Sequence, residues 1–189
     1  GWVGALLGAL VSIAGVFFLQ AALVEAVSDV RDGKADLSVG ETLGRVWPRL
    51  GTVVGAGILA AIGIGIGFVL LIAPGFYLLT IWSMIIPAIV LENRGIGESF
   101  GRSRELVRGF GWTVFGVILV TFLLVGVSSL ILDLVLSPLD DSLASFISDL
   151  VSGTIFVPFV AATYTVMYFL LRDQKEPVPE QVEGAAFTE

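Results

Sequence analysis

The chain contains no cysteine and no histidine among its 189 residues. The absence of cysteine excludes disulfides, thiol chemistry and cysteine–zinc sites. The absence of histidine removes the commonest general base and the commonest transition-metal ligand. Charged residues are also scarce: they make up 14% of the chain, against about 25% in soluble domains, while 56% of the residues are hydrophobic. This composition favours a membrane protein over a soluble enzyme.

Long uncharged runs are the strongest signal in the sequence. No Asp, Glu, Lys or Arg occurs in residues 1–24, 50–91, 109–132 or 150–171. A helix that crosses a bilayer needs about 20 apolar residues, so three runs fit one helix each and the longest run fits two. These runs predict an all-α, polytopic transmembrane helix bundle in one membrane domain, residues 1–172, with spans at residues 2–24, 50–72, 76–91, 110–133 and 150–171.

Two features of these runs need separate interpretation. The run 50–91 is expected to turn at Pro74–Gly75, because this dipeptide marks tight turns. A signal peptide is the alternative reading of residues 1–24. It is disfavoured because the segment lacks a basic start and its apolar part is too long.

The basic residues predict the orientation. All ten Lys and Arg residues lie after the first, third or fifth predicted span, whereas residues 133–149 carry four aspartates and no base. Because Lys and Arg stay in cytoplasmic loops, we expect a multi-pass protein of the plasma membrane with a cytoplasmic carboxyl end. Residues 173–189 are polar and predict a disordered cytoplasmic tail. No broad basic face indicates a nucleic-acid partner.

A short phrase occurs twice on the predicted cytoplasmic side, as GETLGR at 40–45 and GESFGR at 97–102. Ser38 and Glu41 have the spacing of a capping box before the first copy. The pattern predicts interfacial amphipathic helices at about 39–48 and 96–108, with arginines near anionic lipid. Ordinary loop helices are the alternative. The candidate contacts with lipid phosphate are Arg45, Arg49, Arg102, Arg104 and Arg108.

The phrase also suggests an internal repeat of one interfacial helix followed by a membrane hairpin. Residues 38–92 and 96–172 form two complete units, and both have the same orientation in the membrane, as parallel repeats do. Residues 1–24 resemble the second half of a further unit. We therefore expect a sixth membrane helix before Gly1 in the parent protein.

Small and polar residues give expectations about packing and chemistry. Glycines spaced four apart at 51–55 and 63–67 predict close helix contacts and a central place for the helix 50–72. Pro87 and Pro158 predict kinks. No ionisable residue lies inside a span, and no metal-ligand, cofactor or nucleophile–base pattern occurs. We therefore expect no catalytic activity and no cofactor.

Residues 73–116 resemble the membrane domain of glycerophosphoryl diester phosphodiesterases, a family that includes stand-alone membrane proteins. The resemblance implies a six-helix membrane module without the hydrolase domain of the fused members. Arg104 departs from the aromatic residue that the family often has after its Arg–Ser pair. The residues that carry the resemblance as a structural motif are Pro74, Gly75, Tyr77, Trp82, Pro87, Glu92, Ser103 and Gly109.

The sequence leaves two functions open. The first is a non-catalytic integral membrane protein that handles lipid or organises the envelope, with membrane lipids as partners. The second is a small transporter or a membrane subunit of a transport complex, which the parallel repeats favour. A further membrane or cytoplasmic protein stays open as a partner in either case.

Overall fold

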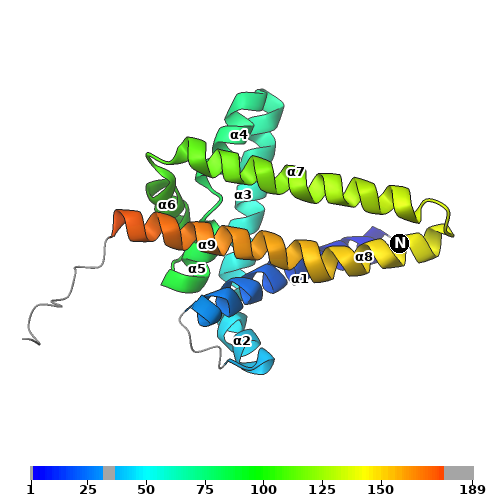
Figure 1. Cartoon of the computed structure of the whole chain (residues 1–189). Helices are drawn as coiled ribbons and strands as arrows, with labels where there is room; N and C mark the ends of the chain where they lie inside the picture. Colours follow the sequence, from blue (N-terminus) through cyan, green and yellow to red (C-terminus); the bar gives the residue numbers. More distant parts are fainter. Residues whose placement is uncertain (1, 32–36, 177–189) are drawn as a thin grey trace, which may run out of the picture.

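The computed structural model describes residues 2–31 and 37–176, which form helices and no strands (Figure 1). The five predicted apolar stretches and the two predicted amphipathic segments are all helical. The helices and helical turns are α1 (Trp2–Arg31), α2 (Val39–Val46), η1 (Trp47–Arg49), α3 (Leu50–Leu70), α4 (Ile72–Ile81), α5 (Ile85–Glu92), α6 (Ile96–Val107), α7 (Gly111–Leu136), α8 (Asp141–Val151), η2 (Ser152–Phe156) and α9 (Val157–Lys175).

Four helical stretches are long and apolar enough to cross a membrane: Val39–Leu70, Ile72–Glu92, Gly111–Leu136 and Asp141–Lys175. The first apolar run forms α1, which is not one of these four. Large apolar side chains stand exposed all around α7, including Phe122, Leu123 and Ile131. Soluble proteins rarely expose apolar surface on this scale, so these helices suit a membrane environment.

Several boundaries differ from the sequence prediction. The turn between α3 and α4 falls at Leu71, which is extended, and Pro74 lies inside the first turn of α4, where its missing N–H is tolerated. The segment 133–149 is almost entirely helical, because α7 continues to Leu136 and α8 begins at Asp141. The predicted tail begins as the last turn of α9, and residues 177–189 lie outside the described part of the chain.

Pro87 and Pro158 lie at the starts of helical elements. The third predicted span divides into α4 and α5 at a turn over residues 82–84, and Pro87 occupies the first turn of α5. The π-helical turn Ser152–Phe156 precedes Pro158, which lies at the start of α9. Such a turn absorbs the hydrogen bond that proline cannot make.

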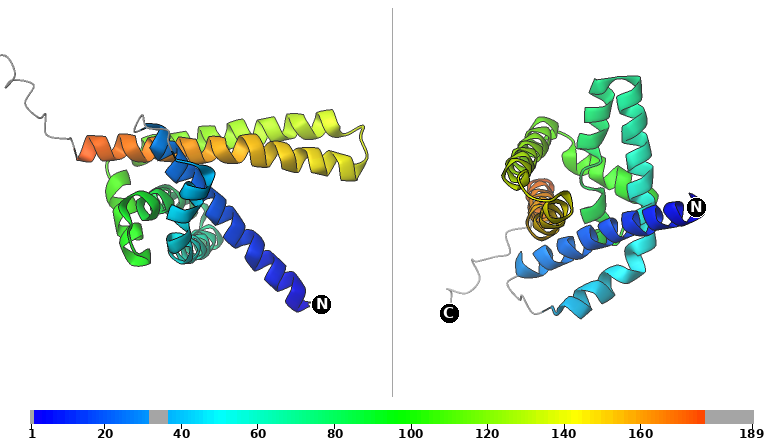
Figure 2. Two further views of the ribbon diagram at one scale, coloured as in Figure 1. Left: turned by 90° about the horizontal axis from the view of Figure 1, so that it is seen from below. Right: turned by 90° about the vertical axis from the view of Figure 1, so that its right-hand side faces the viewer.

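The two hairpins cross each other instead of running side by side. The hairpin of α3 and α4 stands across the hairpin of α7 with α8 and α9 (Figure 1). In the left view of Figure 2, α7 and α9 run lengthwise and α3 is seen end-on. In the right view, α3 runs lengthwise and α7 and α9 are seen end-on. The parallel arrangement of the two predicted repeat units is therefore wrong for this structure, since one bilayer normal cannot follow both hairpins.

The core surrounds α5, which packs on both sides. Ala88 and Met84 join a cluster with α6, α7 and α9, whereas Ile85 and Ile89 join a cluster with α1, α2 and α3. The predicted central place for α3 is wrong, because its side chains from Ile58 onwards are largely exposed. Glycine periodicity indicates that a helix makes close contacts, but it does not indicate which neighbouring helix it contacts.

The close glycine contacts themselves are present within the α3–α4–α5 segment. A Cβ atom added to Gly63 would lie 2.5 Å from the indole of Trp82. One added to Gly67 would lie 3.1 Å from the backbone of Gly75 in α4. The pair Gly63–Gly67 therefore holds this hairpin together, as small residues do in membrane helices.

The two amphipathic helices pack on the protein with their apolar sides. Val46 of α2 is fully buried against α1 and α3, and Leu106 and Val107 of α6 are buried against α5 and α9. Val46, Leu106 and Val107 therefore face the protein, whereas Leu43 of α2 is exposed. The capping box of Ser38 and Glu41 is present as predicted.

Candidate functional site

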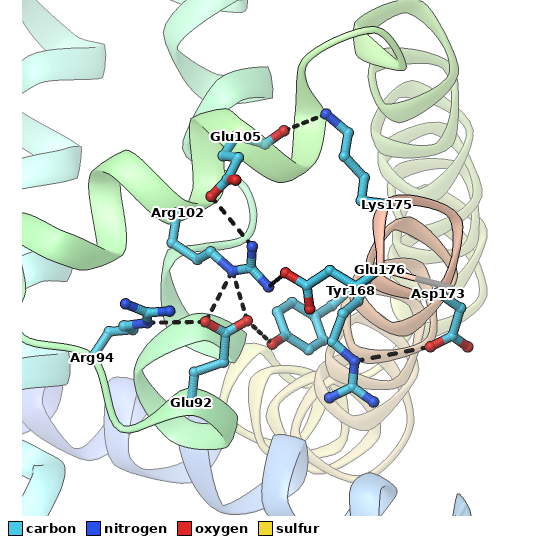
Figure 3. A network of polar contacts seen from close by, with 9 residues as sticks. Glu92, Arg94, Arg102, Glu105, Tyr168, Asp173, Lys175 and Glu176 are labelled. Atoms are coloured by element: carbon cyan, nitrogen blue, oxygen red, sulfur yellow. Dashed lines mark hydrogen bonds and ion pairs between the residues drawn. The ribbon is translucent and has the colours of Figure 1, made fainter. Parts of the chain in front are cut away.

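The charged ends of α5, α6 and α9 meet in one network around Glu92 (Figure 3). Nε of Arg102 donates to both carboxylate oxygens of Glu92, at 2.7 and 2.9 Å. The hydroxyl of Tyr168 in α9 donates to the same carboxylate, and Nε of Arg94 donates at 3.0 Å. Glu92 thus ties three helices together at the end of the molecule where they converge.

Arg102 is the most connected cation of the network. Besides Glu92, its guanidinium reaches Glu105 at 3.3 Å and Glu176 at 2.7 Å, and only 8% of its side chain is exposed. Burial by itself would lower the pKa of Arg102, but the hydrogen bonds that its guanidinium donates to Glu92, Glu176 and Glu105 raise it above its ordinary value. Arg102 is therefore a permanent charge that is neutralised inside the fold.

Two further groups of ion pairs surround this network. Arg31 of α1 pairs with Asp173 of α9 at 2.6 Å, and its guanidinium lies 3.9 Å from the ring centre of Phe169. Arg45 pairs at 3.2 Å with Glu25 of α1. The charged side chains thus connect the end of α1 with the end of α9 and with the end of α2.

Arg49 acts as a cap for α5. Its Nη1 donates to the carbonyl oxygen of Val90 at 2.7 Å, and its Nε donates to the side chain of Asn93 at 3.1 Å. Asn93 ends α5 in the left-handed conformation. Basic side chains at this position satisfy the last carbonyls of a helix.

Ser103 forms hydrogen bonds with backbone groups at the break between α4 and α5. Its hydroxyl donates to the carbonyl oxygen of Ile81 at 2.7 Å and accepts from the amide of Met84 at 3.0 Å. Ser103 is fully buried, so its hydroxyl is the partner of two backbone groups that the break would otherwise leave unpaired.

The five arginines predicted from the sequence to contact lipid have different environments. The structure brings Arg102 into the carboxylate network and uses Arg45 and Arg49 in contacts between helices, as described above. Arg104 and Arg108 alone remain exposed with no ion pair to another described residue. For Arg102, the predicted lipid contact is replaced by buried pairing within the protein.

The residues of the family-like motif serve packing and backbone geometry. Trp82 packs edge-on against Phe100 at 5.0 Å between ring centres, and Gly109 has φ +92°, which permits the turn from α6 to α7. Tyr77 is exposed on α4. The remaining members Pro74, Gly75, Pro87, Glu92 and Ser103 have the places already given.

The sequence did not indicate the partners of the arginines. Tyr168, Glu25 and Glu176 come from segments far from the residues they contact, and no short motif connects them. The only sequence signal that could have indicated a polar contact of Tyr168 was its position. Tyr168 lies one turn before Arg172, at the charged end of an apolar helix. That pattern is equally typical of an aromatic anchor at a membrane surface.

The buried polar side chains of the network are all hydrogen-bonded. Among the described residues, every buried side-chain nitrogen or oxygen has a hydrogen-bond partner. The same part of the chain contains no group of three or more acidic side chains arranged to hold a metal ion. The arrangement around Glu92 connects α5, α6 and α9.

Comparison of the chain with protein-family models, with curated proteins and with solved structures found no match. The resemblance to the phosphodiesterase membrane domain, noted over residues 73–116, accordingly has no support from these comparisons. The functional argument depends on the geometry of the chain itself.

Proposed function

We propose that the chain is a non-catalytic integral membrane protein that crosses the bilayer and binds anionic lipid at its charged end. Four candidate spans support the membrane location. The proposal adds α1, which packs on α9, as a span and places the convergent ends of α1, α5, α6 and α9 at the cytoplasmic surface. The α3–α4 hairpin lies across α7 and α9, so the proposal does not count it as a crossing.

The observation that carries this proposal is the segregation of charge. Every described basic residue lies near the convergent helix ends, whereas the far end of the α7–α8 hairpin carries Asp133, Asp140, Asp141 and Asp149. The confinement of the basic residues to one end corresponds to the distribution in membrane proteins, in which Lys and Arg remain cytoplasmic. The cytoplasmic leaflet carries anionic lipid, which attracts cations near its surface.

A resemblance to membrane modules of the phosphodiesterase family would agree with this function, and it stays part of the proposal. Transport gains no support from the broken helix α4–α5. Broken helices of transporters present free backbone carbonyls to a substrate. Here the Ser103 hydroxyl already forms hydrogen bonds with the carbonyl of Ile81 and the amide of Met84.

Lipid-dependent stability tests the proposal. The protein is purified in a neutral detergent, and thermal unfolding is followed while phosphatidylglycerol or phosphatidylcholine is added. A ligand that binds only the folded state raises the unfolding midpoint in proportion to its occupancy. We expect a larger rise with phosphatidylglycerol, which shrinks with added salt. Equal midpoints with both lipids at all salt concentrations would contradict an anionic-lipid function.

A further inference from the structure

Arg104 and Arg108 differ from the other described basic residues, because their side chains have no partner within residues 2–31 and 37–176. Each of the remaining ones, from Arg31 to Lys175, contacts a carboxylate or a backbone carbonyl of the described chain. Arg104 and Arg108 lie four residues apart, at the end of α6 and just after it, and both are exposed. Two positive charges therefore remain available to a ligand.

Both arginines line the same groove, which has a volume of about 600 Å³. The groove lies between α4 and the junction of α6 with α7, with Tyr77 and Ile81 on one side and Arg104, Val107 and Arg108 on the other. Ligand sites in proteins typically have volumes of roughly 300–1,000 Å³. We call this feature the Arg104–Arg108 groove.

Three of the residues that line the groove are glycines. Gly101, Gly109 and Gly111 all line it, and a Cβ atom added to any of them would meet no other atom within 4 Å. The backbone is consequently open to a bulky group, and Gly109 at φ +92° requires a residue without a side chain to make the turn.

The chemistry of the lining combines donors with apolar surface. Guanidinium groups bind phosphate through charge-assisted hydrogen bonds. The exposed phenol of Tyr77 is a further donor, while Ile81 and Val107 present hydrocarbon. Glu105 also lines the groove, but Arg102 contacts its carboxylate at 3.3 Å. The two arginines thus leave the groove with a net positive charge.

The aromatic residues next to the groove suit a membrane surface. Trp112 follows Gly111 directly and is 87% exposed, and it packs edge-on against Phe115. Phe115 in turn packs against Phe76 of α4, which joins the two walls of the groove. Exposed tryptophan is enriched at the level of lipid headgroups.

From these observations we propose that the Arg104–Arg108 groove is a binding site for the phosphate of a membrane phospholipid, with Arg104, Arg108 and Tyr77 as its donors. This assignment depends on the proposed lipid function, and it locates that function at one groove rather than across the whole charged end. The apolar wall formed by Ile81 and Val107 contacts the adjoining part of the lipid.

Charge-matched variants test the site in the stability assay described above. The double variant R104Q/R108Q removes both groove cations, and R94Q/K175Q removes two cations of the same end that have partners. Because a hydrogen bond to a charged group contributes about 1.5–3 kcal/mol, we expect the apparent Kd for phosphatidylglycerol to rise at least about tenfold in R104Q/R108Q. We expect less than a threefold rise, roughly the effect of general charge loss, in R94Q/K175Q.

Other outcomes separate the site from the function. Equal losses in both double variants, with wild-type binding intact, would overturn the groove and leave lipid binding at the charged end standing. Absence of any preference for phosphatidylglycerol in the wild type would overturn both. Unfolding midpoints without lipid show whether R104Q/R108Q folds normally, and the single variants R104Q and R108Q provide an independent measurement if it does not.

Soluble phosphates distinguish the two sources of the ligand. Inorganic phosphate and glycerol 3-phosphate are added to the same protein at the headgroup concentrations used for the lipid. We expect at least about tenfold weaker stabilisation, because they lack the apolar part that contacts Ile81 and Val107. Equal stabilisation would overturn the assignment to a lipid and indicate a soluble phosphate ligand instead. Loss of phosphatidylglycerol affinity in Y77F would support the phenol as a donor, and unchanged affinity would remove it.

Discussion

The guanidinium of Arg102 in α6 and the carboxylate of Glu92 at the end of α5 form a two-point contact, with Nε 2.7 and 2.9 Å from the two carboxylate oxygens. Both side chains are mostly buried, at 8% and 13% exposed. Tyr168 brings α9 to the same carboxylate. This contact is the junction that holds the charged ends of three helices together.

Replacement of Glu92 by Gln is expected to destabilise the protein strongly. Breaking a buried ion pair costs about 3–5 kcal/mol when the remaining charge stays buried, and Arg102 keeps only its more exposed partners. The variant E105Q is the matched control, because it removes another partner of Arg102 that is 66% exposed. Exposed pairs contribute about 0–1 kcal/mol.

The measurement for this pair is the free energy of unfolding in mixed detergent micelles. We expect E92Q to lose several times more stability than E105Q. Equal losses in the two variants would show that the burial of Glu92 has no special role.

Replacement of Ser103 by Ala is expected to leave the carbonyl of Ile81 and the amide of Met84 unpaired. Each unpaired buried group costs about 1–3 kcal/mol. Ser99 is the control, because it is equally buried on α6 and its hydroxyl bonds only to Ile96 of its own helix. Unfolding midpoints should therefore fall clearly in S103A and little in S99A. The reverse order would contradict the role of Ser103 at the helix break.

Replacement of Gly63 by Ala is expected to force Trp82 to move, since the added Cβ atom would lie 2.5 Å from its indole. Overpacking of this kind costs about 1–3 kcal/mol. Gly65 is two residues away on α3 and has open space at its Cβ position, so G65A is the matched control. A midpoint lowered in G63A and unchanged or raised in G65A supports the contact. A comparable loss in both variants would indicate a general requirement for glycine in α3.

The sequence was sufficient to predict the helices because their signals are local. Apolar run length located α3 and α7, and the Ser38–Glu41 spacing located the start of α2. The continuity of α8 with α9 was missed, because serines and aspartates around 140–149 are also typical of loops. The roles of these polar residues in a helix depend on tertiary contacts. One example is the hydrogen bond from Ser148 to Asp133 of α7 at 3.3 Å.

The candidate sites were predictable only in part. Periodicity placed Arg104 and Arg108 on the polar side of α6, and both are exposed there. The same periodicity could not show that Arg102 is buried, because its partner Glu176 lies at the end of a distant helix. Nor could it show that the hairpins cross, because no local signal sets the angle between segments that meet only through side-chain packing.

The central claim is that the chain crosses the membrane with its basic end on the cytoplasmic side. Since the chain has no cysteine, single-cysteine variants can be labelled without background. The informative positions are Leu71 between α3 and α4, Ser142 at the start of α8 and Gly97 in α6, all of which are exposed. A membrane-impermeant maleimide should label S142C in intact cells and G97C only after lysis.

Labelling of G97C and S142C from the same side of intact membranes would contradict the account. Labelling of S142C without L71C would show that the α3–α4 hairpin does not cross the bilayer.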